Sequence, residues 1–344
     1  MELKRLHNIP KLVFLLLLLI VTGCNDSDDV NSSSTDDKYY YYPTDEASVT
    51  AAQIGDGTGT LDPRGITIAN DKLYVCNDNA LDIFDAKTLK HLKSVTSFSK
   101  GTTNIAFTKL SSVCVDNKRI YLGSVDSRLF VLDETTNLGI NTVGNGNWWD
   151  TFVHVFGVVV KDGLVFVKEK NTTIKVFETS QITETSKWNL APIAKLNTLN
   201  GYDEFYSLQI EGGNLVVAGR NAKAYLYYDI ASIRAKAAAS LVTPILPVTK
   251  PFSDAKPIAV SINSDWAITS ENIGDVNFLR FYPKEEFLNK TYSARINASD
   301  VMGENPFGTI LGIAQLDDRI FLSDNTNKKI RVLKLKKFLI SEQK

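Results

Sequence analysis

The chain has 344 residues, of which 44% are hydrophobic and 22% are charged, and its formal net charge at pH 7 is −1. Such a chain presents no basic field for nucleic acid, so we expect no nucleic-acid partner. Three cysteines and three histidines are too few for a disulfide scaffold or a Cys/His zinc cluster. A single core rarely extends over this length, which favours a core distributed over repeated units.

The first 23 residues have the pattern of a signal peptide. Three basic residues precede the apolar run 12–21, which is too short for a comfortable membrane span. The run ends at Val21-Thr22-Gly23-Cys24. This segment resembles the bacterial lipobox, in which small residues before a cysteine admit the lipoprotein signal peptidase. The resemblance implies that Cys24 becomes the acylated first residue; an ordinary secretory signal with a chance cysteine is the alternative.

An acidic stretch follows the cysteine. Residues 25–29, Asn-Asp-Ser-Asp-Asp, resemble the export signal that sends lipoproteins of the Bacteroidetes to the outer face of the outer membrane. The resemblance implies a lipid-anchored protein of the cell surface, although a solvated start to a linker is the alternative. Residues 24–46 are rich in Asp and Ser and cannot bury enough apolar surface to offset their ordering entropy. We therefore expect a disordered acidic tether at 24–46 and a folded domain at 47–344.

A complete structural unit is visible from Pro63 to Val95. Four apolar runs of strand length alternate with polar turns there, which predicts a four-stranded antiparallel meander. The runs begin at Gly65, Leu73, Leu81 and His91.

The unit recurs down the chain with a spacing of about 50 residues. Its second strand opens at Leu73, Ile120, Val165, Leu215, Trp266 and Ile320. An all-β repeat of this length predicts a propeller, in which no repeat can bury both faces alone. We expect six blades, with seven as the main alternative. The sixth copy lacks an outer strand, which residues 48–54 could supply, and the Ala-rich residues 234–239 predict a rim helix.

The copies resemble two related propeller families. Residues 63–75 and 312–332 are similar to NHL repeats, whereas 81–85 and 129–133 are similar to the Leu-Val-Ile-Val-Asp repeats of bacterial surface propellers. The resemblance implies the fold alone, because these families include enzymes, receptors and scaffolds.

Loops that enter each inner strand should converge on one face around the channel, together with loops joining the second and third strands. This face combines polar and aromatic residues, a mixture that suits a sugar or a peptide. The candidate ligand-binding residues are Trp148, Trp149, Arg64, Tyr202, Glu204 and Arg220. The Trp148-Trp149 pair lies in a Gly/Asn loop and is the strongest local candidate, although one indole packing under the loop is the alternative.

Catalytic interpretations are weaker. His154 could approach the channel, but a packing histidine is the simpler interpretation. Glu169, flanked by Lys168 and Lys170, could be a charge-tuned general base, but a solvated loop residue is the simpler interpretation. Residues 324–325 and 77–78 could form an oxygen-rich calcium site, although turn formation between strands is the favoured interpretation. We assign no catalytic residue, no metal ligand and no cofactor, with calcium as an open alternative.

The leading hypothesis is a lipid-anchored, extracytoplasmic, monomeric propeller that binds a glycan or an envelope protein without catalysis. One rival is an NHL-like enzyme, a metal-dependent lyase or lactonase. The other is a pure scaffold or adhesion module. Cys76 and Cys114 lie in neighbouring repeats and are either a disulfide or two buried thiols.

Overall fold

The computed structural model describes residues 39–55, 57, 59–147, 151–170, 173–197, 205–219, 223–238, 248–251, 256–273, 276–284, 287, 294–297 and 307–339. The chain divides into two compact units, Tyr41–Phe338 and a smaller one made of Met1–Tyr40 with Leu339–Lys344. Of the smaller unit, only the strand residues 39–40 and 339 are described. The six four-stranded sheets lie in the larger unit, apart from these strand ends.

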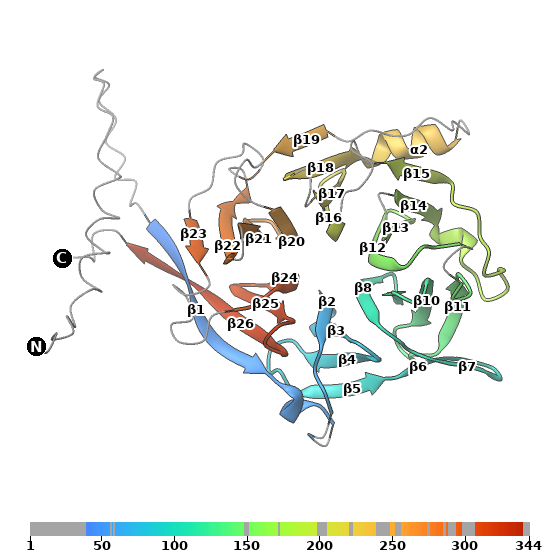
Figure 1. Ribbon diagram of the computed structural model, residues 1–344, viewed down its shortest axis with the longest axis horizontal. Helices are drawn as coiled ribbons and strands as arrows, with labels where there is room; N and C mark the ends of the chain where they lie inside the picture. The colour runs from blue at the N-terminus through green and yellow to red at the C-terminus, as the bar shows by residue number, and fades with distance from the viewer. Residues whose placement is uncertain are drawn as a thin grey trace, which may run out of the picture. The chain divides into compact units, whose positions relative to one another are not determined.

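Six four-stranded sheets follow one another around a central channel (Figure 1). The larger unit is therefore a six-bladed β-propeller, as the repeats predict, and the seven-bladed alternative is wrong. Within the described ranges, no helix combines the length and the apolar character needed to cross a membrane.

The first three blades follow the predicted order of strands from the channel outward. Blade 1 contains β2 (Pro63–Ala69), β3 (Lys72–Asn77), β4 (Ala80–Asp85) and β5 (His91–Val95). Blade 2 contains β8 (Leu110–Asp116), β9 (Arg119–Ser124), β10 (Arg128–Asp133) and β11 (Gly139–Val143). Blade 3 contains β12 (Val155–Lys161), β13 (Leu164–Glu169), β14 (Thr173–Glu178) and β15 (Ala194–Asn197).

The remaining blades repeat this order, and the last one borrows a strand from the other end of the chain. Blade 4 contains β16 (Phe205–Glu211), β17 (Asn214–Gly219), β18 (Ala224–Asp229) and β19 (Val248–Pro251). Blade 5 contains β20 (Lys256–Ile262), β21 (Trp266–Ile273), β22 (Val276–Pro283) and β23 (Ala294–Asn297). Blade 6 contains β24 (Ile310–Leu316), β25 (Arg319–Asp324), β26 (Lys329–Leu339) and β1 (Tyr39–Val49).

The closing strand β1 lies earlier in the chain than the predicted 48–54. It reaches into the segment predicted as tether, and residues 51–53 instead form the short 3-10 helix η1. Val49 is fully buried between blades 6 and 1, which explains why the strand is anchored at this end. Ring closure through an N-terminal strand leaves blade 6 without an exposed outer edge on β26.

Tight two-residue turns join the first two strands of most blades. Asn70 and Asp71 both have positive φ, and so do Asn117 and Lys118 in the next blade. Positive φ at both central positions is the geometry of type I′ turns, whose twist matches that of antiparallel strands. The polar turns that punctuate the sequence are therefore hairpin turns, as predicted.

The hydrophobic core is divided into six clusters, one between each pair of neighbouring blades. Strand β3 shows how the sequence builds them, because its side chains alternate between the two faces of the sheet. Leu73 and Val75 pack toward blade 6, whereas Tyr74 and Cys76 pack toward blade 2. Each blade is thus buried on both faces, which explains why its middle strands are almost continuously apolar.

Three local features refine the sequence interpretation. The rim helix is present as α2 (Ile230–Ala238). The register of blade 5 makes Ala267, and not Trp266, the equivalent of Leu73, because Ala267 pairs with Ile262 as Leu73 pairs with Ile68. An additional hairpin, β6 (Ser97–Lys100) with β7 (Thr103–Ala106), lies at the periphery of the ring (Figure 1).

Candidate functional site

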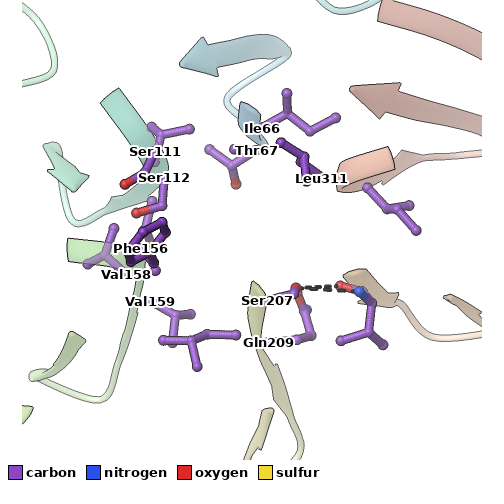
Figure 2. Close-up of a pocket in the computed structure, with 18 residues that line it drawn as sticks. Ile66, Thr67, Ser111, Ser112, Phe156, Val158, Val159, Ser207, Gln209 and Leu311 are labelled. Carbon is purple, nitrogen blue, oxygen red and sulfur yellow. Dashed lines mark hydrogen bonds between the residues drawn. The ribbon is translucent and has the colours of Figure 1, made fainter. Parts of the chain in front are cut away.

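The candidate site is the central channel and its mouth on the face of the entering loops. A small cavity of about 100 Å³ lies on the channel axis, and all six inner strands contribute to its wall. Figure 2 shows the side chains that surround it. Those labelled are Ile66, Thr67, Ser111, Ser112, Phe156, Val158, Val159, Ser207, Gln209 and Leu311.

Every inner strand carries a β-bulge near its first residues, at the mouth of the channel. A small residue stands at the same register position beside each bulge. It lies eight residues before the first core residue of the second strand in each blade, which is Leu73 in blade 1 and Ala267 in blade 5. These positions are Gly65, Ser112, Gly157, Ser207, Ala259 and Gly312.

The small residues allow neighbouring inner strands to approach closely. A Cβ on Gly65 would lie 2.5 Å from the Ser112 Cα, and a Cβ on Gly312 would lie 2.8 Å from the Arg64 carbonyl oxygen. Real side chains do not occupy such contacts, so glycine is required at both positions. The bulges and the small residues together produce the narrow channel.

The polar groups in the channel wall connect neighbouring blades. Ser111 Oγ donates to the Val155 carbonyl at 2.7 Å, and Gln315 Nε2 donates to the Ser261 carbonyl at 3.0 Å. Figure 2 draws the equivalent bonds between Ser207 and Val260. Among the residues lining the cavity, the one titratable side chain is the Cys114 thiol, and burial raises its pKa to about 12. Among the described residues, the wall therefore offers hydroxyls, an amide and apolar surface, and its lining contains no carboxylate, imidazole or amine.

A charged cluster, made of Asp62, Arg64, Asp78, Asn325 and Lys328, occupies the mouth where blades 1 and 6 meet. Asp62 is its centre, because its carboxylate accepts from Asn325 Nδ2 at 2.6 Å and from Lys328 Nζ at 2.5 Å. Arg64 Nη2 lies 3.4 Å from Asp62 Oδ2 and 3.9 Å from Asp78 Oδ1. We call this set the mouth cluster. It brings together Arg64 and other residues that the sequence places on the same face.

The electrostatics of the mouth cluster keep Asp62 ionised. Partial burial alone would raise the pKa of this carboxyl, but the hydrogen bond from Lys328 and the charge of Arg64 hold its pKa below the usual 3.8. Arg64 and Lys328 keep side-chain exposures of 30% and 57%, so both cations remain accessible from solvent. The cluster can bind an anionic or hydroxyl-rich group without rearranging the channel.

Arg64 is the one predicted ligand-binding residue that the structure describes. Trp148, Trp149, Tyr202, Glu204 and Arg220 lie outside the described residues, and so does the predicted lipid-attachment residue Cys24. Thr103 and Asn104 lie before the inner strand of blade 2 in the sequence, but they belong to the peripheral hairpin strand β7 and not to the mouth.

A recurrent polar pair lies beneath the mouth and explains several of the candidate catalytic residues. The last residue of the second strand is paired with a residue of the third strand in several blades. Glu169 pairs with Lys175 at 2.8 Å, and Asp324 pairs with Arg331 at 2.8 Å. The same carboxylates also accept backbone N–H groups of the entering loops, from Val153 at 2.9 Å and from Gly308 at 3.1 Å.

These pairs hold the entering loops in place. Glu169 is buried and not a solvated loop residue, because β13 extends through it. Asp324 is fully buried, and its two oxygens accept from Arg331 and from the Gly308 amide. Asn77 likewise donates to Asp82, at 2.7 Å. The predicted grouping of 324–325 with 77–78 is therefore divided: Asp324 and Asn77 are buried beneath the mouth, whereas Asp78 and Asn325 belong to the mouth cluster. No group of three His, Cys, Asp or Glu side chains that could hold a metal ion occurs among the described residues.

A serine and a histidine of the outer strand β5 meet an aspartate of the neighbouring strand β4 in blade 1. Ser94 Oγ donates to Asp82 Oδ1 at 2.5 Å, and His91 Nε2 lies 3.1 Å from the same serine oxygen. His91 Nδ1 accepts from the Gly55 amide at 3.3 Å, which places the ring proton on Nε2. The serine hydroxyl therefore faces a carboxylate and a proton donor, the reverse of what an activated nucleophile requires.

The other described histidine and the two described cysteines are packed within the blades. His154 Nδ1 bonds to the Val125 carbonyl, and the His154 amide donates to Ser127 Oγ at 3.2 Å, as a packing histidine would. Cys76 and Cys114 are both free thiols. Burial raises the pKa of the Cys76 thiol as well, so neither residue is an activated nucleophile.

Comparisons with known proteins support the propeller fold but do not indicate a function. No known family matches the chain, and no curated protein matches it. Among solved structures, 1337 chains match, so the architecture is too widespread to single out a function. A chain of the "Crystal Structure of Mitotic Checkpoint Complex" is similar over 90% of this chain and 97% of that chain, with a TM-score of 0.53 and 12% sequence identity. At that identity, the likeness shows the fold alone.

Two features of the surface are absent from the sequence prediction. Lys328 completes the mouth cluster, but it lies in a hairpin turn that looks like any other polar turn in the sequence. Trp188 is 39% exposed beside a hollow on blade 3. The sequence shows only a single tryptophan in a long Ser/Thr-rich connection, which does not distinguish a buried side chain from an exposed one. Its exposure becomes visible only in the structure.

Proposed function

We propose that this protein is a non-catalytic binding module whose ligand contacts the mouth of the propeller channel. The mouth cluster carries the proposal, because Arg64 and Lys328 present accessible cations directly above a channel wall of hydroxyls, an amide and apolar surface. The buried carboxylates beneath the mouth are neutralised by Arg and Lys and hold loops in place, so they serve architecture. This combination suits recognition of a polar ligand better than chemistry on it.

We propose further that the propeller is a lipoprotein held on the outside of a bacterial outer membrane. The apolar run 12–21 followed by Gly23-Cys24 supports this address, as does the acidic stretch 25–29. Acylation of Cys24 would give an anchor of several chains, each methylene contributing about 0.8 kcal/mol of membrane affinity.

The ligand class that we propose is a glycan of the envelope or environment, with an envelope protein as the second candidate. Hydroxyl-rich ligands match the cations and the polar wall, and the predicted Trp148-Trp149 loop would add stacking surface. The similar chain from the mitotic checkpoint complex belongs to a protein assembly, which is consistent with the protein alternative but does not select it. We propose that the module acts as a monomer.

A glycan array followed by calorimetry tests the ligand proposal. The chain should begin at Asn25, because a start at Glu46 would remove most of strand β1. We expect Arg64→Ala to weaken binding by about tenfold, the effect of losing one charge-assisted hydrogen bond of about 1.4 kcal/mol. The double variant Trp148→Ala/Trp149→Ala tests the loop in the same way. Lys87→Ala is the control, because Lys87 is an exposed lysine paired with Asp71 away from the mouth.

Two results would contradict the proposal. One is binding that none of the mouth variants changes. The other is turnover of a lactone or uronide substrate by the unmodified chain, which would favour the lyase or lactonase alternative.

A further inference from the structure

The connection between β14 and β15, residues 179–193, forms a second surface on the rim of blade 3 (Figure 1). A hollow of about 420 Å³ lies beside it. Its walls are Thr151, Lys175, Trp188, Asn189, Leu190, Pro192 and Lys195. The hollow lies on the outer strands of one blade, away from the channel cavity, with which it shares no residue.

The connection is held rigidly by groups other than the Trp188 side chain. Asn141, a buried residue of blade 2, donates to the carbonyls of Thr183 and Ser186 at 2.8 and 2.9 Å. Arg119 donates to the Ile182 carbonyl at 2.9 Å, and the Gly144 amide donates to the Trp188 carbonyl at 2.9 Å. The backbone at Trp188 is therefore fixed from outside, while the indole remains 39% exposed.

Trp188 thus presents an exposed aromatic side chain on a backbone that other groups hold in place. The flat apolar face of its indole matches the C–H face of a pyranose ring. Because the backbone is already ordered, ligand binding loses little further conformational entropy there. Asn189 supplies an amide beside it, which can donate to and accept from sugar hydroxyls.

The charges around the hollow are positive. Its lining contains two lysines and no aspartate or glutamate. Lys175 is already engaged, because its Nζ lies 2.8 Å from Glu169 Oε1 and also bonds to the Thr151 carbonyl. Lys195 is exposed on β15, directly across the sheet from Lys175, and has no carboxylate partner among the described residues. One cation is thus available to a ligand.

We propose that this hollow is a binding site for an acidic saccharide, with Trp188 stacking on a sugar ring and Lys195 pairing with its carboxylate. The inference goes beyond the mouth of the channel and stands without it. A neutral saccharide would contact the indole and Asn189 but could not form an ion pair with Lys195, so an acidic sugar ring is favoured.

Calorimetry with a tetrasaccharide of galacturonic acid, compared with the neutral galactose tetrasaccharide, tests the site on the chain beginning at Asn25. We expect Trp188→Ala to weaken uronide binding at least tenfold and Trp188→Phe to retain much of it, since phenylalanine keeps an aromatic face. Lys195→Ala should weaken the uronide several-fold and leave the neutral sugar unchanged. Lys187→Ala is the matched control, because this exposed lysine precedes Trp188 but does not line the hollow.

The outcomes separate this site from the channel mouth. Uronide binding that persists in Trp188→Ala, or no uronide binding by the unmodified chain, would overturn the inference. Loss in Arg64→Ala with no change in Trp188→Ala would assign the ligand to the mouth and reject the hollow. An unchanged unfolding temperature for Trp188→Ala would show that lost binding is not lost folding, as the external clamps on the backbone predict.

Discussion

At the scale of single residues, the charged side chains of this protein form two groups, one buried and one partly exposed. Those beneath the loops are buried and paired, as Asp324 and Arg331 are, and removing one partner there would leave an uncompensated buried charge. Those of the mouth cluster are half-exposed and keep part of their surface for a ligand. Burial, and not residue type, therefore separates structural from accessible charges.

Asp62→Asn should destabilise the protein modestly at neutral pH. The folded-state pKa of Asp62 lies below its usual 3.8, so its contribution is complete above that value and is lost as the pH falls through the folded pKa. Because the pairs are partly exposed, we expect a loss of about 1 kcal/mol or less in the free energy of unfolding at pH 7. Urea unfolding at pH 7 and at pH 3 measures it, and the difference between variant and unmodified chain should shrink at pH 3.

The control for this prediction is Asp71→Asn. Asp71 and Lys87 form a pair at 3.2 Å with side-chain exposures of 62% and 60%, so its loss should change stability by only a few tenths of a kcal/mol at pH 7. Equal losses for Asp62→Asn and Asp71→Asn would show that the mouth cluster contributes nothing beyond an ordinary surface pair.

At the scale of elements, the sequence predicts the blades well because their period and their turns agree. Alternating apolar runs joined by Asn-Asp, Asp-Gly or Gly-Gly turns specify a hairpin through local geometry alone. The prediction of Trp266 as the first core residue of its strand, one residue too early, shows that local sequence does not always define the strand register. Both Trp266 and Ala267 are plausible openings for an apolar strand, and only the pairing of Ala267 with Ile262 fixes the register.

Other parts of the fold depend on distant contacts and are not visible in a local pattern. The hairpin β6–β7 consists of two four-residue strands around Gly101, so its sequence resembles a loop. Its position depends on Phe98, whose ring lies against Gly139 and 5.9 Å from the Phe130 ring centroid. The mouth cluster joins Asp62 to Lys328 from opposite ends of the chain, and the Trp188 hollow requires Asn141 of another blade.

Strand β1 closes the ring, so its removal should destabilise the propeller. A chain that begins at Thr50 loses Val49, whose full burial contributes about 1.5–3 kcal/mol, and exposes the edge of β26. We expect a lower unfolding temperature and a tendency to aggregate, measured by calorimetry and light scattering against the chain beginning at Asn25. A peptide of residues 39–49 added in excess should restore much of the stability, whereas a scrambled peptide should not. Equal stability of the two chains would contradict this role for β1.

At the scale of the whole molecule, the fold separates the surfaces that can bind from the parts that hold the ring together. Each interface between blades has its own hydrophobic cluster, and the serine, glutamine and buried acid–base pairs fasten the inner strands and the entering loops. Loop residues at the mouth and on the rim of blade 3 are therefore free to vary in chemistry without altering the ring.

The proposed lipid anchor would determine the location of the protein without contributing to its folding. Cys24 precedes β1, the first described strand, so Cys24→Ser should leave the unfolding temperature of the mature chain unchanged. In a bacterial host that processes lipoproteins, the same change should abolish incorporation of labelled fatty acid. When residues 1–23 are replaced by a secretory signal peptide that does not depend on Cys24 for cleavage, the variant should also move from the membrane to the soluble fraction, since the lipid supplies the membrane affinity. Cys76→Ser is the control, because that thiol is buried in blade 1 and should not alter labelling. A Cys24→Ser protein that stays in the membrane fraction would show that another part of the chain, or a membrane partner, holds it there.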